Sequence, residues 1–312
     1  MTDGLPPPPP ETMRQRIGYW QYRAAWDAVS FLPDRVAFPL ADRAGDIWFR
    51  RASARQRALV RRHLTLITGS TDETTLEALV RAAYRSYARY WIDSFRVHRM
   101  DAERVHSKTV DGGRSSVDDL RDSGLGGIMV TGHIGSWDAA ALYAKHVGWR
   151  LAVVAEVVEP RRLFDRFVAM RRHIGLEVFP LVRGGDMVDK LEGFIAGGGI
   201  ATLLADRDLT KKGPIVDFFG EPCRLPPGPA VLARRTGRPV VAAAVAATPT
   251  GWYVYARDPV DIADLSIDEG TQVVAHELEA LIRRFPEQWH VFVPNWLADR
   301  EPEPGAVAAP DG

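Results

Sequence analysis

After Gly112 the sequence alternates between short apolar runs and longer segments with helical spacing. Strands that alternate with helices of about ten or more residues are typical of βαβ units. The pattern therefore predicts an α/β fold with a mostly parallel or mixed central sheet, flanked by helices on both faces. We expect strands at 127–131, 150–158, 176–181, 199–205, 238–247 and 252–257, and helices at 137–147, 161–173, 185–197, 227–237 and 271–285.

The chain before Gly112 predicts helices only. Residues 13–32 combine aromatic and basic side chains and end at Pro33, so we expect a helix there. This helix is either a core helix with solvated arginines or a helix on a membrane surface, where Trp and Tyr beside Arg suit the headgroup layer. A second helix begins near Asp72, and its face repeats Leu76, Leu79, Val80, Ala83, Tyr84, Tyr87 and Trp91 at helical spacing.

The composition at the two ends of the chain differs from that of its middle. Residues 1–12 are rich in proline and predict a disordered leader, and residues 300–312 predict a flexible tail. Between them we expect a single domain over 13–299. It would consist of a helical N-terminal part, 13–110, and an α/β body, 111–299.

Charge and cysteine content exclude several classes of protein. Forty basic residues balance forty acidic ones, so no positive field predicts a nucleic-acid partner. The single cysteine, Cys223, excludes a disulfide scaffold and a cysteine-based metal site and fits a reducing compartment. The histidines lack the spacing of metal ligands, so we expect no metal. We also expect no signal peptide and no membrane-spanning helix, because no basic segment leads into an apolar core and no apolar run is long enough.

Several common catalytic motifs are missing from the sequence. It contains no GxxxxGK[ST], no GxSxG and no HExxH, which argues against a Walker phosphate loop, a serine hydrolase elbow and a zinc protease. The segment GLGGIM at 124–129 lacks the third glycine of GxGxxG and precedes a strand instead of following one, so a dinucleotide-binding fold is not expected.

A histidine follows the first strand of the predicted body, in the segment VTGHIGSWD at 130–138. The carboxyl ends of strands line the ligand crevice of open α/β sheets, so His133 is placed for function. Asp138 lies in the first turn of the next helix, where it can approach the ring, fix its tautomer and raise its basicity. We expect Ser136 to cap this helix, and backbone amides at Gly135 and Ser136 to stabilise an oxyanion. The alternative is that His133 only bonds a loop carbonyl.

A second candidate segment follows the strand at 199–205. Parallel strands would bring Asp206 to the same edge of the sheet as His133. Arg207 and Arg224, with Lys211 and Lys212, make the region basic, which suits phosphate groups. The alternatives are an N-cap with a surface ion pair for Asp206, and a solvated loop for the basic residues.

Four segments together resemble a known family. They are TGHIGSWDAA (131–140), RLFDRFVAMRRHIGLEVFPL (162–181), ADRDLTKKGPIVDFFGEPCRLPPGPAVLARRTGRPVV (205–241) and PEQWHVFVPNWLAD (286–299). In this order they resemble the bacterial lipid acyltransferases related to the lipid A late acyltransferases, which carry an H-x4-D/E motif. The similarity is greatest to the actinobacterial phosphatidylinositol mannoside acyltransferase branch.

The resemblance implies roles for individual residues. His133 would be the general base, and Asp138 matches the acid of the motif. Asp206 stands where the family carries a glutamate thought to help the histidine, and its side chain is one methylene shorter. Arg166 and Arg171 lie in a block where the family has a functional arginine, and the sequence does not choose between them.

The resemblance also implies the reaction. A fatty acyl group, typically palmitoyl, would pass from acyl-CoA to a mannose hydroxyl of a phosphatidylinositol mannoside, at the cytoplasmic face of the plasma membrane and on an anionic membrane surface. A thioester is already activated, so neither a covalent intermediate nor a cofactor is expected. The alternatives are another glycolipid acceptor, such as a lipid A precursor, and a lipid-binding protein with a decayed site.

Overall fold

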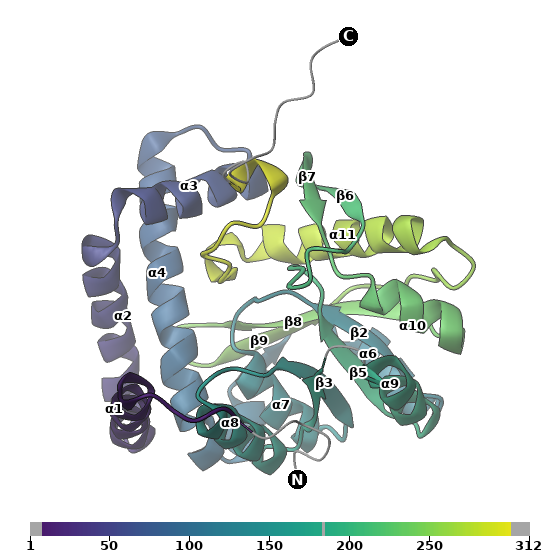
Figure 1. Cartoon of the computed structure of the whole chain (residues 1–312), viewed down its shortest axis with the longest axis horizontal. Helices are drawn as coiled ribbons and strands as arrows, with labels where there is room; N and C mark the ends of the chain where they lie inside the picture. The colour runs from purple at the N-terminus through teal and green to yellow at the C-terminus, as the bar shows by residue number, and fades with distance from the viewer. Residues whose placement is uncertain (1–7, 183–184, 301–312) are drawn as a thin grey trace.

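The computed structural model describes residues 8–182 and 185–300, in which an N-terminal group of helices stands beside an α/β body (Figure 1). The helices are α1 (Met13–Ser30), α2 (Asp34–Arg51), α3 (Ala54–Thr68), α4 (Glu73–Arg96), α5 (Ala102–Ser107), α6 (Ser115–Asp122), α7 (Trp137–His146), α8 (Arg161–His173), α9 (Met187–Ala196), α10 (Gly228–Thr236) and α11 (Ile267–Arg284). Short 3₁₀ helices are η1 (Val97–Arg99), η2 (Pro286–Gln288) and η3 (Leu297–Asp299).

The central sheet has seven strands in the order β1-β9-β8-β2-β5-β3-β4, and β6 and β7 form a separate hairpin. Only the β8–β9 pair within the large sheet is antiparallel, which confirms the predicted mostly parallel sheet. The strands are β1 (Thr109–Asp111), β2 (Gly127–Thr131), β3 (Leu151–Glu156), β4 (Glu177–Leu181), β5 (Ile200–Leu204), β6 (Ile215–Phe218), β7 (Glu221–Arg224), β8 (Val240–Ala247) and β9 (Trp252–Ala256).

Helices cover both faces of the sheet because its central strand is apolar on both sides. All five residues of β2 are buried. Successive strand residues point to opposite faces, so Ile128 and Val130 pack with α9, α10 and α11, whereas Met129 packs with α6, α7 and α8. Figure 1 shows α10 and α11 on one side of the sheet and α7 and α8 on the other.

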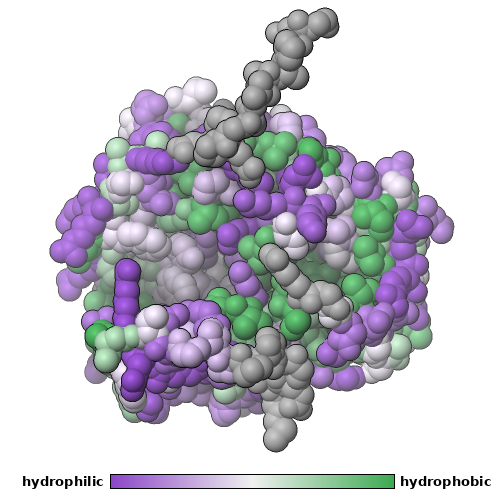
Figure 2. Space-filling model, viewed as in Figure 1, coloured by the Kyte–Doolittle hydropathy of each residue, from purple (hydrophilic) through white to green (hydrophobic). Residues whose placement is uncertain are grey.

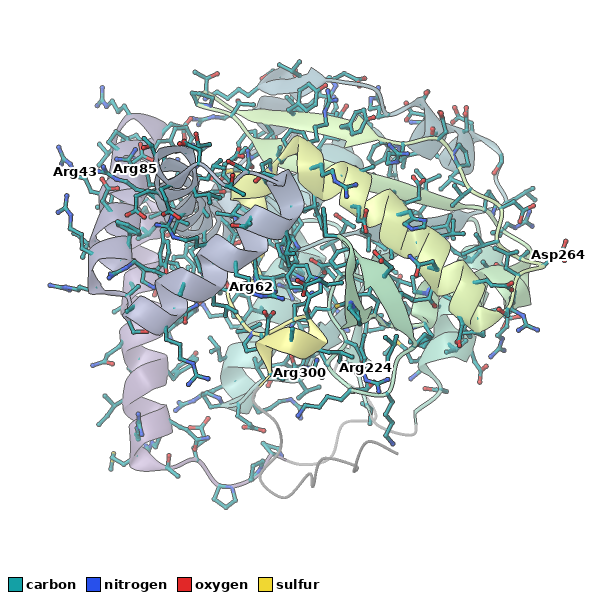
Figure 3. All side chains as sticks on the ribbon, turned by 90° about the horizontal axis from the view of Figure 1, so that it is seen from above. Arg43, Arg62, Arg85, Arg224, Asp264 and Arg300 are labelled. Atoms are coloured by element: carbon teal, nitrogen blue, oxygen red, sulfur yellow. The ribbon has the colours of Figure 1, made fainter. Side chains whose placement is uncertain are left out.

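The N-terminal helices are held together around α4. The predicted start of this helix is confirmed, since the Asp72 carboxylate caps it by accepting from the Thr75 amide at 2.7 Å. Gly45 on α2 allows close packing, because a Cβ there would come within 2.5 Å of the Cα of Arg85 on α4. Arg85, which is labelled in Figure 3, also pairs with Asp46 of α2 at 2.7 Å.

The N-terminal helix α1 docks on the α/β body. Its Trp26 is almost fully buried and contacts Phe167 of α8 in the body and Phe95 of α4, each at 5.3 Å between ring centroids. The outer side of the same helix leaves Met13, Ile17 and Trp20 exposed. The buried side fits the interpretation as a core helix, and the membrane-surface interpretation stays a prediction for the exposed side.

Several short elements were not predicted. The β6–β7 hairpin turns through Phe219 and Gly220, both with positive φ, and a phenylalanine in this conformation lacks the Asn-Gly or Asp-Gly signal of such turns. Strand β1 has only three residues, and α6 is a short helix. Trp289 and His290 lie in a segment in which Trp289 forms an isolated antiparallel bridge with Ile134.

The predicted leader and tail fall mostly outside the described residues, which begin at residue 8 and end at Arg300. Within residues 8–182 and 185–300, no helix combines the length and the apolar character that crossing a bilayer requires.

Candidate active site

His133 and Asp206 meet at the carboxyl edge of the sheet. Strands β2 and β5 are parallel neighbours in a register that pairs Thr131 with Leu204, so His133 and Asp206 each lie two residues beyond the end of the pairing. The ring Nδ1 of His133 lies 2.8 Å from Oδ1 of Asp206, and the His133 amide donates to Oδ2 at 2.7 Å. The shorter aspartate therefore reaches the histidine directly.

The two groups of the His133–Asp206 pair shift the pKa of each other in opposite directions, and the imidazole becomes more basic. Burial acts to raise the pKa of Asp206, but the charge of His133 and its hydrogen bonds outweigh this effect and hold that pKa below its usual value. Burial acts to lower the pKa of His133, and the charge and hydrogen bond of Asp206 outweigh it, so this pKa is raised. The carboxylate thus favours protonation of the ring and makes His133 a stronger base.

The second ring nitrogen of His133 is open. Within the described part of the chain Nε2 has no hydrogen-bond partner, and the His133 side chain is 33% exposed. Because Asp206 accepts from Nδ1–H, the lone pair lies on Nε2. This arrangement suits general-base chemistry on a hydroxyl group.

A distant segment of the chain completes the site. The indole of Trp289 donates from Nε1 to Oδ2 of Asp206 at 2.7 Å, and the Asn295 amide donates to the Asp206 carbonyl at 3.1 Å. The backbone of this segment pairs with the histidine loop, with the His290 amide donating to the His133 carbonyl at 2.8 Å. Sequence reasoning missed Trp289 and Asn295 as site residues; their only signal was their place in the segment PEQWHVFVPNWLAD (286–299) of the resemblance.

Asp138 lies in the first turn of α7, as predicted, but it does not orient His133. It is fully buried, and its carboxylate accepts from Ser94 Oγ at 2.6 Å and pairs with Arg171 at 3.4 Å. The prediction that Asp138 supports the ring is therefore wrong in this structure, because α4 and α8 supply its partners. Asp138 braces the start of α7 against these two helices.

The structure separates the two candidate arginines. Arg171 pairs with Asp138 and lies over the Trp137 ring at 4.3 Å. Arg166 pairs with Asp27 of α1 at 2.6 Å. Both guanidinium groups thus have carboxylate partners within the chain, and only Arg171 touches the H-x4-D motif.

The two candidate phosphate-binding arginines also differ. Arg207 directly follows Asp206, is half-buried, and lies near enough to His133 for its charge to oppose protonation of the ring. Arg224, at the end of β7, donates from Nη1 to the Gly213 carbonyl at 2.8 Å (Figure 3). Only Arg207 is thereby placed beside the base.

The expected oxyanion donors are occupied. The Gly135 amide donates to the Gln288 carbonyl at 3.0 Å, and the Ser136 amide donates to the Val245 carbonyl at 2.9 Å. The structure therefore does not support an oxyanion site at these amides. Gly135 is required here, since it has φ +60° and a Cβ would lie 2.2 Å from the Val245 oxygen. Ser136 occupies the N-cap position of α7, but its side chain makes no capping bond.

A strip of aromatic rings extends from the site along α4, and we call Tyr87, Trp91 and Phe95 the aromatic strip. Each of its side chains is partly exposed. The ring centroids are 6.1 Å apart for Tyr87 and Trp91 and 5.9 Å for Trp91 and Phe95, and Tyr87 stacks on His290 at 4.8 Å. Figure 2 shows this side of the molecule hollowed between the N-terminal helices and the α/β body. The strip offers a partly exposed apolar surface that begins at His290, whose amide bonds the His133 carbonyl.

Comparison with known proteins identifies the family. The model of the bacterial lipid A biosynthesis acyltransferases matches residues 10–298. The chain belongs to this family. It is also similar to two proteins named phosphatidylinositol mannoside acyltransferase. The one from Mycobacterium tuberculosis (strain ATCC 25618 / H37Rv) is 32% identical over 95% of this chain and 93% of its own length. The one from Mycolicibacterium smegmatis is 32% identical over 90% and 92%. The protein is thus an acyltransferase, and the His133–Asp206 pair is its candidate base.

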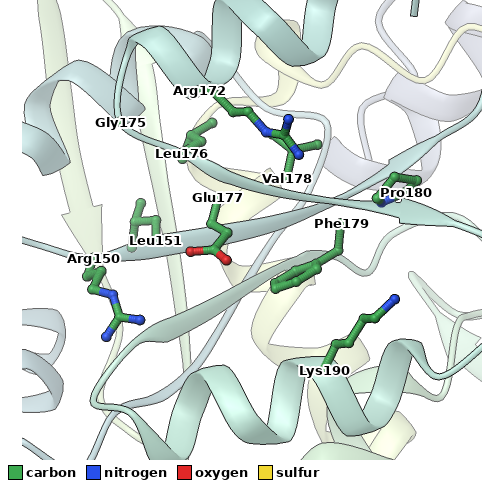
Figure 4. A pocket seen from close by; sticks show the side chains of 10 residues that line it. All are labelled: Arg150, Leu151, Arg172, Gly175, Leu176, Glu177, Val178, Phe179, Pro180 and Lys190. Carbon is green, nitrogen blue, oxygen red and sulfur yellow. The ribbon is translucent and has the colours of Figure 1, made fainter. Parts of the chain in front are cut away.

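A pocket of about 550 Å³ lies elsewhere, at the edge of the sheet beside β4 (Figure 4). Arg150, Phe179 and Lys190 are among its lining residues, and none of the site residues lines it. Arg150 donates to the Gly197 carbonyl at 2.6 Å, and Lys190 pairs with Asp186 at 2.8 Å. Because the His133–Asp206 pair lies elsewhere, this pocket is not part of the candidate active site.

Proposed function

We propose that this acyltransferase transfers a fatty acyl group, palmitoyl or similar, from acyl-CoA to a mannose hydroxyl of a phosphatidylinositol mannoside. The observation that carries the proposal is the His133–Asp206 pair, in which Nδ1 is bonded to a buried carboxylate and Nε2 is open. The relatives from two mycobacterial species support the choice of acceptor through the activity in their names.

In the proposed reaction His133 acts as a general base. Nε2 takes the proton of the sugar hydroxyl while the hydroxyl oxygen attacks the thioester carbonyl carbon and forms the new C–O bond. Asp206 stabilises the resulting imidazolium. The tetrahedral intermediate then expels the CoA thiolate, the C–S bond breaks, and the proton passes from Nε2 to the sulfur. The thioester needs no further activation, so the proposal contains no acyl-enzyme, metal or other cofactor.

Two features of the site support the donor. The aromatic strip provides an apolar surface for an acyl chain, since transfer of methylene groups from water to such a surface is favourable by about 0.8 kcal/mol each. Arg207 and Arg224 remain in the proposal as cations for the phosphates of CoA or of the lipid. Arg166 and Arg171 do not, because both are paired with carboxylates of the chain.

We further propose that the enzyme acts as a peripheral protein on an anionic membrane at the cytoplasmic face. Met13, Ile17 and Trp20 recur at helical spacing on the exposed side of α1, beside Arg14 and Arg16. On α2 the exposed side carries Val36, Leu40, Arg43 and Ile47, and Arg43 projects outward (Figure 3). Apolar and aromatic side chains beside arginines suit the headgroup layer of anionic lipids.

Vesicle sedimentation tests the membrane surface. A double variant, Ile17→Ser with Trp20→Ser, should bind vesicles of phosphatidylglycerol and phosphatidylcholine about tenfold more weakly than the wild type, because it loses apolar contact. Val110→Ser removes an equally exposed apolar side chain from β1 and serves as the control. Equal binding by all three proteins would contradict this part of the proposal.

Transfer of radiolabelled palmitoyl from palmitoyl-CoA tests the reaction. The acceptors are purified phosphatidylinositol mannosides, with phosphatidylinositol and a lipid A precursor for comparison. We expect a product that requires mannose, and a loss of at least about 100-fold in His133→Ala, the lower end of typical general-base contributions. His276→Ala, at an exposed histidine on α11, should transfer normally.

The other outcomes distinguish the alternatives. Transfer to the lipid A precursor alone would identify another glycolipid acceptor. Hydrolysis of palmitoyl-CoA without transfer to any acceptor would support acyl-CoA as the donor and contradict all the tested acceptors. Full transfer by His133→Ala would reject His133 as the general base. If the wild type showed no transfer and no hydrolysis, a lipid-binding protein would become the better explanation.

A further inference from the structure

Four consecutive backbone amides of the histidine loop, those of residues 133–136, already have acceptors within the chain. The amides of His133, Ile134, Gly135 and Ser136 donate to Asp206 Oδ2, the Gly132 carbonyl, the Gln288 carbonyl and the Val245 carbonyl, respectively. Acyl transfer places negative charge on the thioester oxygen, and a hydrogen-bond donor at that position is a large part of catalysis in such reactions. A donor other than these four amides is therefore required.

His290 lies beside His133 and is held from three directions. Its backbone amide donates to the His133 carbonyl at 2.8 Å. Its ring stacks face to face on Tyr87, with centroids 4.8 Å apart and an interplanar angle of 3°. Its Nε2 lies 2.9 Å from Ser86 Oγ on α4. The ring is therefore fixed in position and orientation before any substrate binds.

The other nitrogen of this ring is left for a ligand. His290 is 7% exposed. Its Nδ1 has no hydrogen-bond partner in residues 8–182 and 185–300. This nitrogen is not completely shielded from solvent. Ser86, which holds the opposite nitrogen, faces a separate cavity of about 640 Å³ between α2, α4 and the β8–β9 turn.

The imidazole of His290 stays neutral. Burial, with a smaller contribution from the charge of His133, lowers the pKa of His290 to about 3. A neutral imidazole carries a proton on one nitrogen only, and the hydrogen bond at the other nitrogen decides which one it is. Neutral imidazoles with a lowered pKa are known to polarise carbonyl groups in other enzymes.

We propose that His290 donates a hydrogen bond from Nδ1 to the thioester carbonyl oxygen as that oxygen becomes negative. Ser86 donates its hydroxyl proton to Nε2, which places the ring proton on Nδ1. His133 then removes the proton from the acceptor hydroxyl while His290 stabilises the oxyanion, and no proton leaves His290 during the reaction. This inference rests on the proposed acyl transfer.

Substitutions at His290 and Ser86 test the proposal with palmitoyl-CoA and phosphatidylinositol mannosides. His290→Phe keeps a ring against Tyr87 but removes the donor, and we expect kcat to fall about 100-fold or more with little change in KM. His290→Gln retains an N–H donor and should recover part of kcat. Ser86→Ala removes the hydrogen bond that fixes the tautomer of His290, and kcat should fall less than in His290→Phe. His276→Phe is the matched control on α11.

Spectroscopy separates a donor from a structural role. In ¹⁵N spectra of the histidine-labelled full chain, we expect His290 to be neutral and protonated on Nδ1 from pH 5 to 8, with a changed tautomer ratio in Ser86→Ala. A proton on Nε2, a titration of His290 in this range, or full activity of a folded His290→Phe would overturn the proposal. A wild type without transfer or hydrolysis would instead reject the proposed function itself.

Discussion

Residues 8–182 and 185–300 contain two histidine–aspartate pairs, and only one of them leaves a ring nitrogen open. His133 and Asp206 are joined at 2.8 Å, and His63 and Asp299 at 3.0 Å. The His133 side chain is 33% exposed and keeps Nε2 open. The His63 side chain is 2% exposed and uses both nitrogens, the second at 3.1 Å from the Val291 carbonyl. The same two types of side chain thus form a candidate base in one place and a structural link in the other, and the difference is the open ring nitrogen.

Asn295 connects the two pairs. Its side chain donates to the Asp206 carbonyl at 3.1 Å, and its backbone amide donates to Oδ2 of Asp299 at 3.0 Å. The structural pair therefore fixes the segment that supports the candidate base. Substitutions in the His133–Asp206 pair should lower the rate of acyl transfer, whereas substitutions in the His63–Asp299 pair should lower the free energy of unfolding.

The largest effect is expected for Asp206→Asn. The amide can donate to Nδ1, which would move the ring proton to Nε2 and remove the base. We expect kcat for acyl transfer to fall at least about 100-fold while the fold is kept, since the corresponding substitution in a serine protease triad leaves the geometry intact and costs about 10⁴-fold. Steady-state kinetics and circular dichroism measure the two properties. A folded variant with wild-type kcat would contradict the assignment of Asp206.

His63→Ala should have the opposite result. The change leaves a cavity and removes both bonds of the ring, which should lower the free energy of unfolding by about 3 kcal/mol. The kcat per folded molecule should stay within about threefold of the wild type, because His63 makes no contact with the reacting groups in the proposal. Urea denaturation and an active-site-normalised assay test this. A large loss of kcat in the folded variant would contradict the assignment of a purely structural role to His63.

The pH dependence should report His133. The pKa of His133 is raised from its ordinary value of 6.5 by Asp206, and His133 must be neutral to act as a base. The acid limb of kcat/KM should therefore lie above pH 6.5 in the wild type. It should move to lower pH in Asp206→Asn, in whatever activity remains. An acid limb that is unchanged in this variant would show that another group controls it.

The smallest effects are expected for two tryptophans, one beside each pair. Trp289 Nε1 donates to Asp206 Oδ2, and Trp296 Nε1 donates to the Phe218 carbonyl, both at 2.7 Å. Trp289→Phe removes a donor from the carboxylate that orients the base, so kcat should fall about tenfold, as for loss of one charge-assisted bond. Trp296→Phe loses a bond of the same length and should change stability but not kcat. Equal effects on kcat would mean that the Trp289 bond has no special part.

The position of the site could be predicted from the sequence better than the hydrogen-bond partners of its residues. Parallel strands with polar residues after them were enough to bring His133 and Asp206 to one edge. The role of Asp138 could not be read from its spacing, because the partners of a buried carboxylate depend on α4 and α8, far away in the chain. The supports from Trp289 and Asn295 come from more than eighty residues beyond Asp206, and the occupied amides at Gly135 and Ser136 depend on how that segment and β8 pack.

The tautomer of His133 tests the central claim most directly, through ¹⁵N spectra of the histidine-labelled chain. We predict a proton on Nδ1 in the neutral wild type, a shift of that proton toward Nε2 in Asp206→Asn, and no shift in Asp138→Asn. The same tautomer in the wild type and Asp206→Asn, or a shift caused by Asp138→Asn, would contradict the assignment of Asp206 as the carboxylate that prepares His133 as a base.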